Sequence, residues 1–236
     1  MAENQDKPKT LADELKQLKV FRLIMIPIRI LVALSVMALV AGGPRRFFYE
    51  PAGLVFAGVF CLYLVVERIF QTPDAGGQEK DQGSIKVIWL TSSATYLLAV
   101  AEYYWLRPHW EIVEWNWIWA LVGALVSLAG MLLRVQAMRA LGRYFTISVR
   151  THSEQKLIQE GLYARVRHPA YTGLLLIVAG FVTVFASLAG YLALMFMTLP
   201  GLLNRIRIEE RALTGIFGDE YREYCSRTKR LVPFVY

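Results

Sequence analysis

The sequence has 236 residues, of which 56% are hydrophobic, and a formal net charge of +7. Soluble domains are usually about 45–50% apolar, and here the excess lies in long uncharged stretches, which excludes an ordinary soluble domain and favours membrane-spanning helices. The positive charges lie in the segments between these stretches, and this position relates them to the membrane and argues against binding to nucleic acid.

The chain opens with a polar segment and then becomes strongly apolar. Residues 1–19 are charged and carry no secretory signal pattern, and Leu11, Leu15 and Leu18 alternate with charged residues as in an amphipathic surface helix. Apolar stretches follow at residues 20–40, 51–66, 87–101 and 115–133. We predict that these four stretches are transmembrane helices, the fourth ending at Gly142.

Three charged residues interrupt the first three stretches or lie at their ends. Arg29 lies within the first, Glu67 follows the second, and Glu102 follows the third. A functional role is open for each of the three. For Glu67 we favour the alternative that it pairs with the adjacent Arg68 at the helix end. Glu102 is expected near the outer membrane interface, three residues before Trp105.

The longest uncharged stretch, residues 169–204, has 36 residues. It is too long for one crossing and short for two, so we predict a helical hairpin that turns at residues 186–190, with tilted or partly covered arms. A charged interfacial helix is predicted for residues 204–227, with a bend at Gly218. The expected fold is an all-α, polytopic membrane protein with four transmembrane helices, a C-terminal hairpin and this interfacial helix.

The basic residues predict the orientation in the membrane. Of the 26 Lys and Arg residues, 22 lie in residues 1–22, 67–86, 134–169 and 204–236, which an even number of crossings places on one face. Because basic residues stay on the cytoplasmic side, we predict that both termini, and any site between these loops, are cytoplasmic. The same face suits anionic lipid headgroups.

A polar cluster lies directly before the hairpin, in residues 161–173, which read GLYARVRHPAYTG. Pro169 suits the first turn of a helix, so His168 falls at the helix N-terminus, where free backbone N–H groups favour an anion. Tyr163 and Tyr171 bracket the histidine with ring faces that can contact an adenine or a cation. The alternative is that this segment merely caps a helix at the interface.

A second polar cluster, Arg205, Arg207, Glu209 and Glu210, follows the hairpin. It is either a solvated, salt-bridged helix face or the second half of a site, because the hairpin returns it to the face that carries His168. Polar groups at both ends of a lipid-embedded element are costly unless something binds there. We therefore predict one shared site where lipid meets cytosol. Cys61 and Cys225 suggest neither a disulfide nor a metal site.

These segments resemble the isoprenylcysteine carboxyl methyltransferase family. The likeness runs through residues 130–236, in the segments LLRVQAMRALGRYF (132–145), LIQEGLYARVRHPAYTG (157–173), EERALTGIFGDEYREY (209–224) and VPF (232–234). The wider superfamily shares the RHP and paired-Glu elements with phospholipid N-methyltransferases. The resemblance implies S-adenosylmethionine as methyl donor, a lipophilic prenylated substrate and a methyltransferase core in residues 111–236. Residues 1–110 match nothing beyond further spans and are expected to form membrane-anchoring helices. From the residues themselves we expect neither metal nor nucleic acid as a partner.

The resemblance also implies a role for individual residues. Arg205 would be the catalytic residue that positions the substrate carboxylate. The cofactor-binding residues would be Arg150, Gln155, Lys156, Leu157, Ile158, Tyr163, His168, Pro169, Ala170, Tyr171 and Glu209. Arg134, Arg167 and Glu210 would support the site.

The expected chemistry requires alignment of the reactants more than acid or base catalysis. A carboxylate is ionised at neutral pH, so its methylation needs no general base. The site has to align the reacting atoms and exclude water. Gly173, Gly180 and Gly190 either line a groove for a lipid chain or serve helix packing.

Other functions are open on the sequence. The same scaffold could methylate a phospholipid amine, a small thiol or an isoprenoid acid. An amine or a thiol must lose a proton, so it would require a base near the methyl group. A protein without enzymatic activity, acting in membrane transport or assembly, is the remaining alternative.

Overall fold

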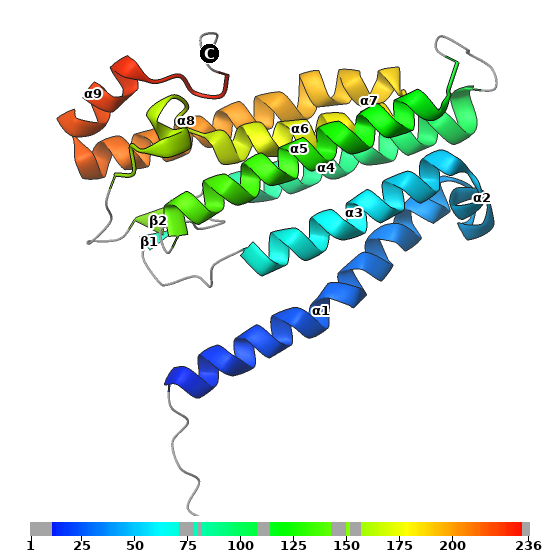
Figure 1. Ribbon diagram of the computed structural model, residues 1–236, viewed down its shortest axis with the longest axis horizontal. Helices are drawn as coiled ribbons and strands as arrows, with labels where there is room; N and C mark the ends of the chain where they lie inside the picture. Colours follow the sequence, from blue (N-terminus) through cyan, green and yellow to red (C-terminus); the bar gives the residue numbers. More distant parts are fainter. Residues whose placement is uncertain are drawn as a thin grey trace, which may run out of the picture.

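The protein is a bundle of long helices (Figure 1). The computed structural model describes the backbone of residues 11–70, 78–79, 82–107, 114–142, 150–151 and 157–232, and the side chains of 25–70, 82–107, 114–142 and 157–232. In chain order the elements are α1 (Leu11–Val40), α2 (Pro44–Tyr49), α3 (Pro51–Phe70), β1 (Gln78–Glu79), α4 (Ser84–Ala101), η1 (Glu102–Leu106), α5 (Trp117–Leu141), β2 (Arg150–Thr151), η4 (Gly161–Ala164), α6 (Pro169–Val184), α7 (Leu188–Ala193), η5 (Leu194–Thr198), α8 (Leu199–Phe217) and α9 (Asp219–Arg227).

The length and composition of the helices make this a multi-pass integral membrane protein. In the described part of the chain, three helices are long and apolar enough to cross a bilayer: Pro51–Phe70, Ser84–Leu106 and Trp117–Leu141. Two shorter apolar helices, Met25–Val40 and Pro169–Val184, lie beside them. Large apolar side chains on the outside, such as Leu39 and Leu90, are about three-quarters exposed in the isolated chain, which fits a surface that faces lipid.

The N-terminal helix differs from the prediction in one respect. The expected surface helix and first transmembrane helix form one continuous helix, α1, with Pro27 inside it. No glycine or other stop signal separates the two predicted segments, so the helix continues through both. The first half of α1 diverges from the bundle in Figure 1. The part of α1 whose side chains are described counts as a shorter apolar helix.

The hairpin and its turn are confirmed. Helix α6 ends at Val184, Ala186 has a positive φ of 47°, and Ser187 caps α7 by accepting a hydrogen bond from the N–H of Gly190. The second arm continues without interruption through α7, η5 and α8, so the apolar arm and the charged helix are one helical element. Gly218, with φ 54°, separates α8 from α9, as the sequence predicts.

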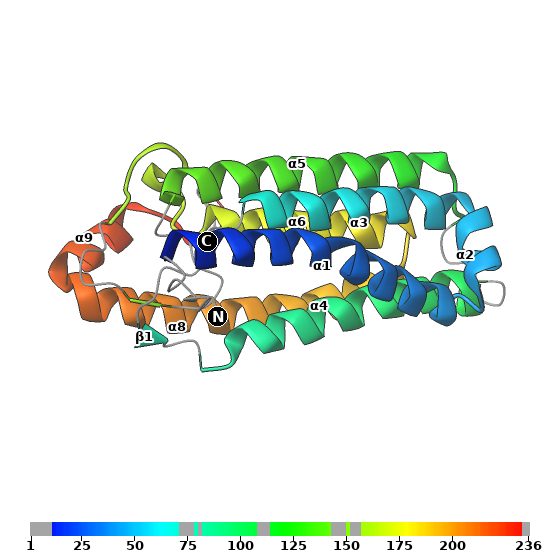
Figure 2. The ribbon, with the colours of Figure 1, turned by 90° about the horizontal axis from the view of Figure 1, so that it is seen from below.

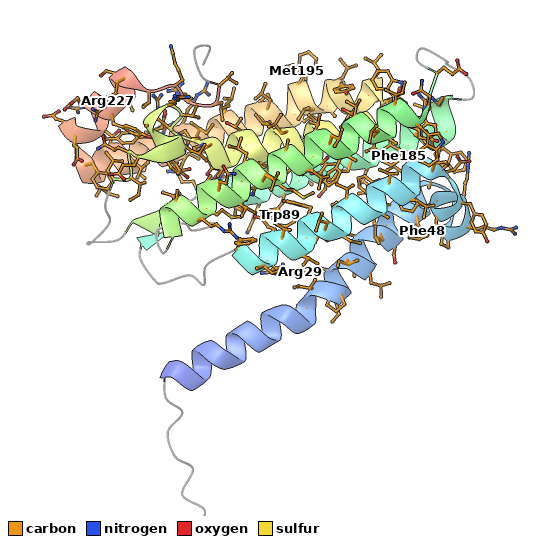
Figure 3. The ribbon with its side chains drawn as sticks, in the orientation of Figure 1. Arg29, Phe48, Trp89, Phe185, Met195 and Arg227 are labelled. Atoms are coloured by element: carbon orange, nitrogen blue, oxygen red, sulfur yellow. The ribbon has the colours of Figure 1, made fainter. Side chains whose placement is uncertain are left out.

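The bundle has two distinct ends. The end of α3, the start of α4, the end of α5, the start of α6 and the end of α8 gather at one end with α9, whereas α2 and the α6–α7 turn lie at the other (Figures 1 and 2). Figure 3 marks the two ends by Arg227 and Phe185. We call these the polar end and the turn end. Glu102 lies at the turn end, where its carboxylate accepts hydrogen bonds from the N–H of Ala189 and the hydroxyl of Ser187.

Small residues allow α5 and α6 to pack with their backbones almost in contact. A Cβ added to Gly130 would lie 2.6 Å from the carbonyl oxygen of Gly173, and one added to Gly173 would lie 2.9 Å from Cβ of Arg134. Gly180 meets Gly123 and Ser127 of α5 in the same way. The glycines of α6 therefore serve helix packing.

An aromatic cluster fills the space between α3, α4 and α6. Phe56, Phe60, Tyr96, Phe181 and Phe185 are all buried, with neighbouring ring centroids 5.1–6.3 Å apart. Most of these ring pairs meet edge to face or tilted, the arrangements that aromatic quadrupoles favour. The cluster joins the N-terminal helices firmly to the C-terminal hairpin.

The packing of α5 on α6 leads to a first prediction. Gly130→Ala should destabilise the protein by about 1–3 kcal/mol, because the added methyl group would overlap the backbone of α6. Gly58→Ala is the matched control, since a Cβ at that position meets nothing within 4 Å. Thermal unfolding in detergent measures both variants. Equal stability of the two would contradict the close approach described here.

Candidate active site

The segment that contains His168 and Pro169 begins α6 as the sequence predicts. Pro169 is the first residue of the helix, and His168 precedes it with φ −125° and ψ 56°. The carbonyl oxygen of His168 accepts hydrogen bonds from the N–H groups of Tyr171 and Thr172. The fixed φ of proline suits this first turn, so the sequence sets the local geometry of the histidine.

The C-terminal tail holds this segment from its other side. The N–H groups of Arg167 and His168 donate to the carbonyl oxygens of Lys229 and Arg230, at 2.7 and 3.0 Å. The hydroxyl of Thr172 donates to the carbonyl oxygen of Leu231 at 2.7 Å. Residues after α9 thus pair with the start of α6 as a short parallel bridge and fix its backbone.

Glu210 of α8 is the centre of an ion cluster at the polar end. Its carboxylate contacts Arg167 at 3.0 Å and Arg230 at 2.9 Å, and Oε1 lies 3.5 Å from Nε2 of His168. Burial alone would raise the pKa of Glu210, but His168, Arg230 and Arg167 together lower this pKa to about 2. Glu210 is therefore ionised at neutral pH and anchors α8 to the start of α6.

Glu209, the neighbouring carboxylate, is arranged differently. One of its oxygens accepts a hydrogen bond of 2.5 Å from the hydroxyl of Tyr171 and lies 4.0 Å from Nδ1 of His168. The side chain is 30% exposed, compared with 12% for Glu210. Glu209 therefore keeps a surface that a ligand can reach, whereas Glu210 is enclosed by its basic neighbours.

Tyr171 connects Glu209 to Arg205. Its hydroxyl donates to Glu209 and accepts a hydrogen bond of 2.8 Å from Nε of Arg205. Arg205 is 3% exposed, and its Nη1 donates to the hydroxyl of Ser84 at 2.9 Å. The ring of Tyr171 stacks on that of His168 with centroids 5.6 Å apart. His168, Tyr171, Arg205 and Glu209 thus form one polar unit, which joins α8 to the start of α6.

His168 lies between the two carboxylates and is 5% exposed. Its Nε2 atom is buried and makes no hydrogen bond within the described part of the chain, although it lies 3.5 Å from the carboxylate of Glu210. A buried polar atom without a partner costs free energy, and such atoms are concentrated at functional sites. The two polar clusters that flank the apolar hairpin do converge, as the sequence predicts.

Arg134 approaches the same helix start from α5. Its Nη1 donates to the carbonyl oxygen of Ala170 at 3.0 Å, and its Nε and Nη2 form two hydrogen bonds of 2.8 and 2.6 Å with the carboxylate of Glu67. The partner of Glu67 across the bundle is therefore Arg134 of α5, a contact that sequence reasoning did not find.

Three other predicted cofactor residues, Leu157, Ile158 and Tyr163, precede His168 in the chain. Tyr163 is 5% exposed, and its hydroxyl donates to the carbonyl oxygen of Ala137 at 3.3 Å. Ile158 packs on the same small apolar cluster, and Leu157 is half-buried. These contacts give Tyr163 and Ile158 a packing role, and their contact with a cofactor stays a prediction.

The remaining predicted residues are outside the part of the structure that can be described. Gln155 and Lys156 belong to undescribed residues, and for Arg150 only its backbone, in β2, is placed. Strand β2 pairs antiparallel with β1, with Gln78 opposite Thr151, and it contacts α8. The loop that carries these predicted residues therefore begins beside the helix that carries Glu209.

Sequence reasoning did not assign Ser84 or Arg230 to the site, and for Glu67 it favoured a helix-end pair with Arg68. Ser84 is an ordinary residue at the start of a helix, and nothing in the sequence links it to Arg205. The signal for Glu67 was its charge at the end of an apolar helix, which requires a partner in the bundle interior. Arg230 lies in the tail whose pairing with α6 depends on tertiary structure. Among the described residues, no group of three His, Cys, Asp or Glu side chains is placed to hold a metal ion.

Known proteins show strong similarity to this chain. Residues 121–215 match the isoprenylcysteine carboxyl methyltransferase family. Protein-S-isoprenylcysteine O-methyltransferase B of Arabidopsis thaliana is 32% identical over 148 residues, which cover 62% of this chain and 72% of the plant protein.

The chain belongs to the isoprenylcysteine carboxyl methyltransferase family. Enzymes of this family are methyltransferases that use S-adenosylmethionine. The matched residues 121–215 include α6 and the part of α8 with Arg205, Glu209 and Glu210, so the polar unit lies in the family's own segment.

One further curated protein and one solved structure are also similar to this chain. Methanethiol S-methyltransferase 1 of Bradyrhizobium diazoefficiens is 38% identical over 73 residues, which cover 31% of this chain and 25% of that protein. The solved structure of a eukaryotic intramembrane Ras methyltransferase aligns with 96% of this chain and 88% of that one, at 21% identity and a TM-score of 0.43.

The ion cluster around Glu210 predicts a change of stability with pH. A carboxylate whose pKa is lower in the folded than in the unfolded protein stabilises the fold above the unfolded value of 4.5, and this contribution is lost as the pH falls towards 2. The wild type should therefore lose thermal stability between pH 4.5 and 2.

Glu210→Gln should show a smaller loss over that range, because its side chain does not ionise. Glu223→Gln is the control, since Glu223 lies exposed on α9 and pairs only loosely with Arg227, at 4.0 Å. Thermal unfolding in detergent across this pH range measures the effect. If the Glu210 and Glu223 variants follow the same profile, Glu210 does not anchor the fold.

Proposed function

We propose that this protein methylates the C-terminal carboxylate of a prenylated cysteine, with S-adenosylmethionine as the methyl donor. The observation that carries the proposal is the joining of His168, Tyr171, Arg205 and Glu209 into one polar unit at the end of an apolar bundle. The relatives named as isoprenylcysteine O-methyltransferases support the choice of acceptor.

The residues of the unit fit the methyl donor chemically. Glu209 has carboxyl oxygens and enough exposure to accept hydrogen bonds from the amine or the ribose hydroxyls of S-adenosylmethionine. The imidazole of His168, whose Nδ1 lies on the side of the more exposed Glu209, is suited to a hydrogen bond with the same molecule. The stacked rings of Tyr171 and His168 provide a π surface for a cationic group. When bound, the cofactor supplies a methyl group on a sulfonium.

Arg205 is suited to position the acceptor carboxylate. A guanidinium presents its N–H groups in a planar fork that matches a carboxylate. In this protein Tyr171 and Ser84 fix the side chain of Arg205 from two directions, so its orientation is set before an acceptor arrives. Because Arg205 is already held in this orientation, it can align the attacking oxygen of the acceptor carboxylate without first having to become ordered itself. We assign Arg134, Arg167 and Glu210 to the support of this arrangement.

The surroundings of the polar unit match a lipophilic acceptor. The unit lies at the polar end of apolar helices whose outer faces suit lipid, so a prenyl chain can stay in the bilayer while its carboxylate reaches the interface. We propose that the polar end, with both termini, faces the cytoplasm, because most Lys and Arg residues belong to segments at that end. Residues 111–236 would form the methyltransferase core and 1–110 its membrane anchor, although Glu67–Arg134 and Ser84–Arg205 connect the two.

The acceptor is tested by comparing methyl transfer to three compounds. The full-length protein in lipid nanodiscs should transfer radiolabelled methyl from S-adenosylmethionine to N-acetyl-S-farnesylcysteine, and much less to phosphatidylethanolamine or to methanethiol. Preference for methanethiol would instead assign the chain the reaction of its bacterial relative. Transfer to none of the three, together with no heat of cofactor binding, would refute the proposed reaction.

The separate roles of Arg205 and Glu209 predict different defects. Arg205→Ala should lower turnover about 10- to 100-fold, the effect of losing a charged hydrogen bond, with little change in cofactor affinity. Glu209→Ala should weaken cofactor binding by a similar factor. Isothermal titration and initial rates measure the two effects, and Arg207→Ala on the same helix is the control. An equal loss of cofactor affinity in Arg205→Ala would show that Arg205 faces the cofactor.

A further inference from the structure

We infer that Glu67 is a positioning residue of the active site: its carboxylate holds Arg134, and Arg134 holds the first turn of α6 through the carbonyl oxygen of Ala170. The inference rests on the proposed function for its catalytic consequence. It adds a residue of the N-terminal half, outside the matched family segment, to a site that the sequence assigns to the C-terminal half alone.

The first step is the geometry of the ion pair. Arg134 presents Nε and Nη2 to the two carboxylate oxygens of Glu67, at 2.8 and 2.6 Å, which is the bidentate arrangement that fixes a guanidinium plane most firmly. Both side chains are 11% exposed. With two of its nitrogens engaged by Glu67, Arg134 has Nη1 directed at Ala170 at 3.0 Å.

The second step is the place of Ala170. It lies between His168 and Tyr171, the two residues whose rings stack and whose polar atoms face Glu209 and Glu210. A shift of the Ala170 carbonyl would move both neighbours. Helix α5 is already close here, because a Cβ on Gly173 would lie 2.9 Å from the backbone nitrogen of Arg134. The hydrogen bond from Arg134 therefore acts across a contact with little freedom.

The third step is cost. A charged pair inside apolar helices loses its hydration, and packed apolar residues of similar volume often give equal or greater stability. Ionisable residues within membrane helices are rare and are usually functional. Apolar residues at these two positions would have no donor for the carbonyl oxygen of Ala170, whereas Arg134 has one. The presence of this ion pair is therefore better explained by its role in holding α6 in position than by a gain in stability alone.

The main test is Glu67→Gln in the full-length protein in nanodiscs. We expect its affinity for S-adenosylmethionine, measured by isothermal titration, to fall about tenfold, because the orientation of Arg134 is no longer fixed. Hydrogen exchange of the Tyr171 and Thr172 amides, which bond to His168, should become faster, whereas the middle of α6 should be unchanged. Unchanged affinity and unchanged exchange would overturn the inference.

Glu102→Gln is the matched control. Glu102 is also a glutamate near a helix end, and it accepts hydrogen bonds from the start of α7, but it lies at the turn end of the bundle. Its replacement should lower thermal stability while cofactor affinity and exchange at the start of α6 stay as in the wild type. An equal loss of affinity in this variant would show that any loss of stability disturbs the site, and would overturn the assignment of Glu67.

A variant in which the two charges are exchanged distinguishes a positioning role of the Glu67–Arg134 pair from simple pairing of the two helices. Glu67→Arg combined with Arg134→Glu restores an ion pair between α3 and α5, but a glutamate at position 134 has no donor for the Ala170 carbonyl. We expect thermal stability closer to the wild type than in Glu67→Gln, with cofactor affinity still reduced. Recovery of both would show that the pair only joins the helices.

The single variant decides the question if the double variant does not fold. Hydrogen exchange also tests the inference without catalysis. A wild-type protein that neither binds the cofactor nor methylates an acceptor would refute the proposed function, while faster exchange in Glu67→Gln alone would still support positioning by Glu67.

Discussion

The arrangement of this protein depends on the pairing of ionised side chains at the edge of an apolar bundle. A charge there loses much of its hydration, so it is stable only when an opposite charge or several hydrogen bonds replace the water. Glu210 meets this requirement by contacting Arg167, Arg230 and His168 together. Because these partners come from the residues just before α6 and from the C-terminal tail, pairing this one carboxylate of α8 brings three segments of the chain together.

The adjacent carboxylate shows how such a cluster can also create a reactive surface. Glu209 follows Glu210 directly, yet it turns towards Tyr171 and keeps more exposure. The pair of glutamates thus divides two tasks between neighbouring positions on one helix. Glu210 is enclosed and pairs with side chains just before α6 and in the tail, whereas Glu209 is bonded to Tyr171, which also orients Arg205. A rigid support beside an accessible group is what alignment of two reactants requires.

The N-terminal helices take part in this support. The aromatic cluster around Phe56 and Phe181 joins α3 to α6, while Glu67 and Ser84 contact Arg134 and Arg205. Helices α3 and α4 are thereby more than an attachment to the bilayer, because they contact the side chains that surround the start of α6. Only α1, whose first half diverges from the bundle, has a looser relation to the described site (Figure 1).

The sequence by itself determined the elements and the local geometry of the site. Uncharged stretches of sufficient length predicted the helices, Pro169 set the first turn of α6, and Gly142 and Gly218 marked helix ends, since these features act through the chain nearby. Tertiary structure alone decided which charges meet. Glu67 forms its bidentate pair with Arg134 across the bundle, because helix packing brings residues far apart in sequence within hydrogen-bonding distance, and no local pattern encodes that distance.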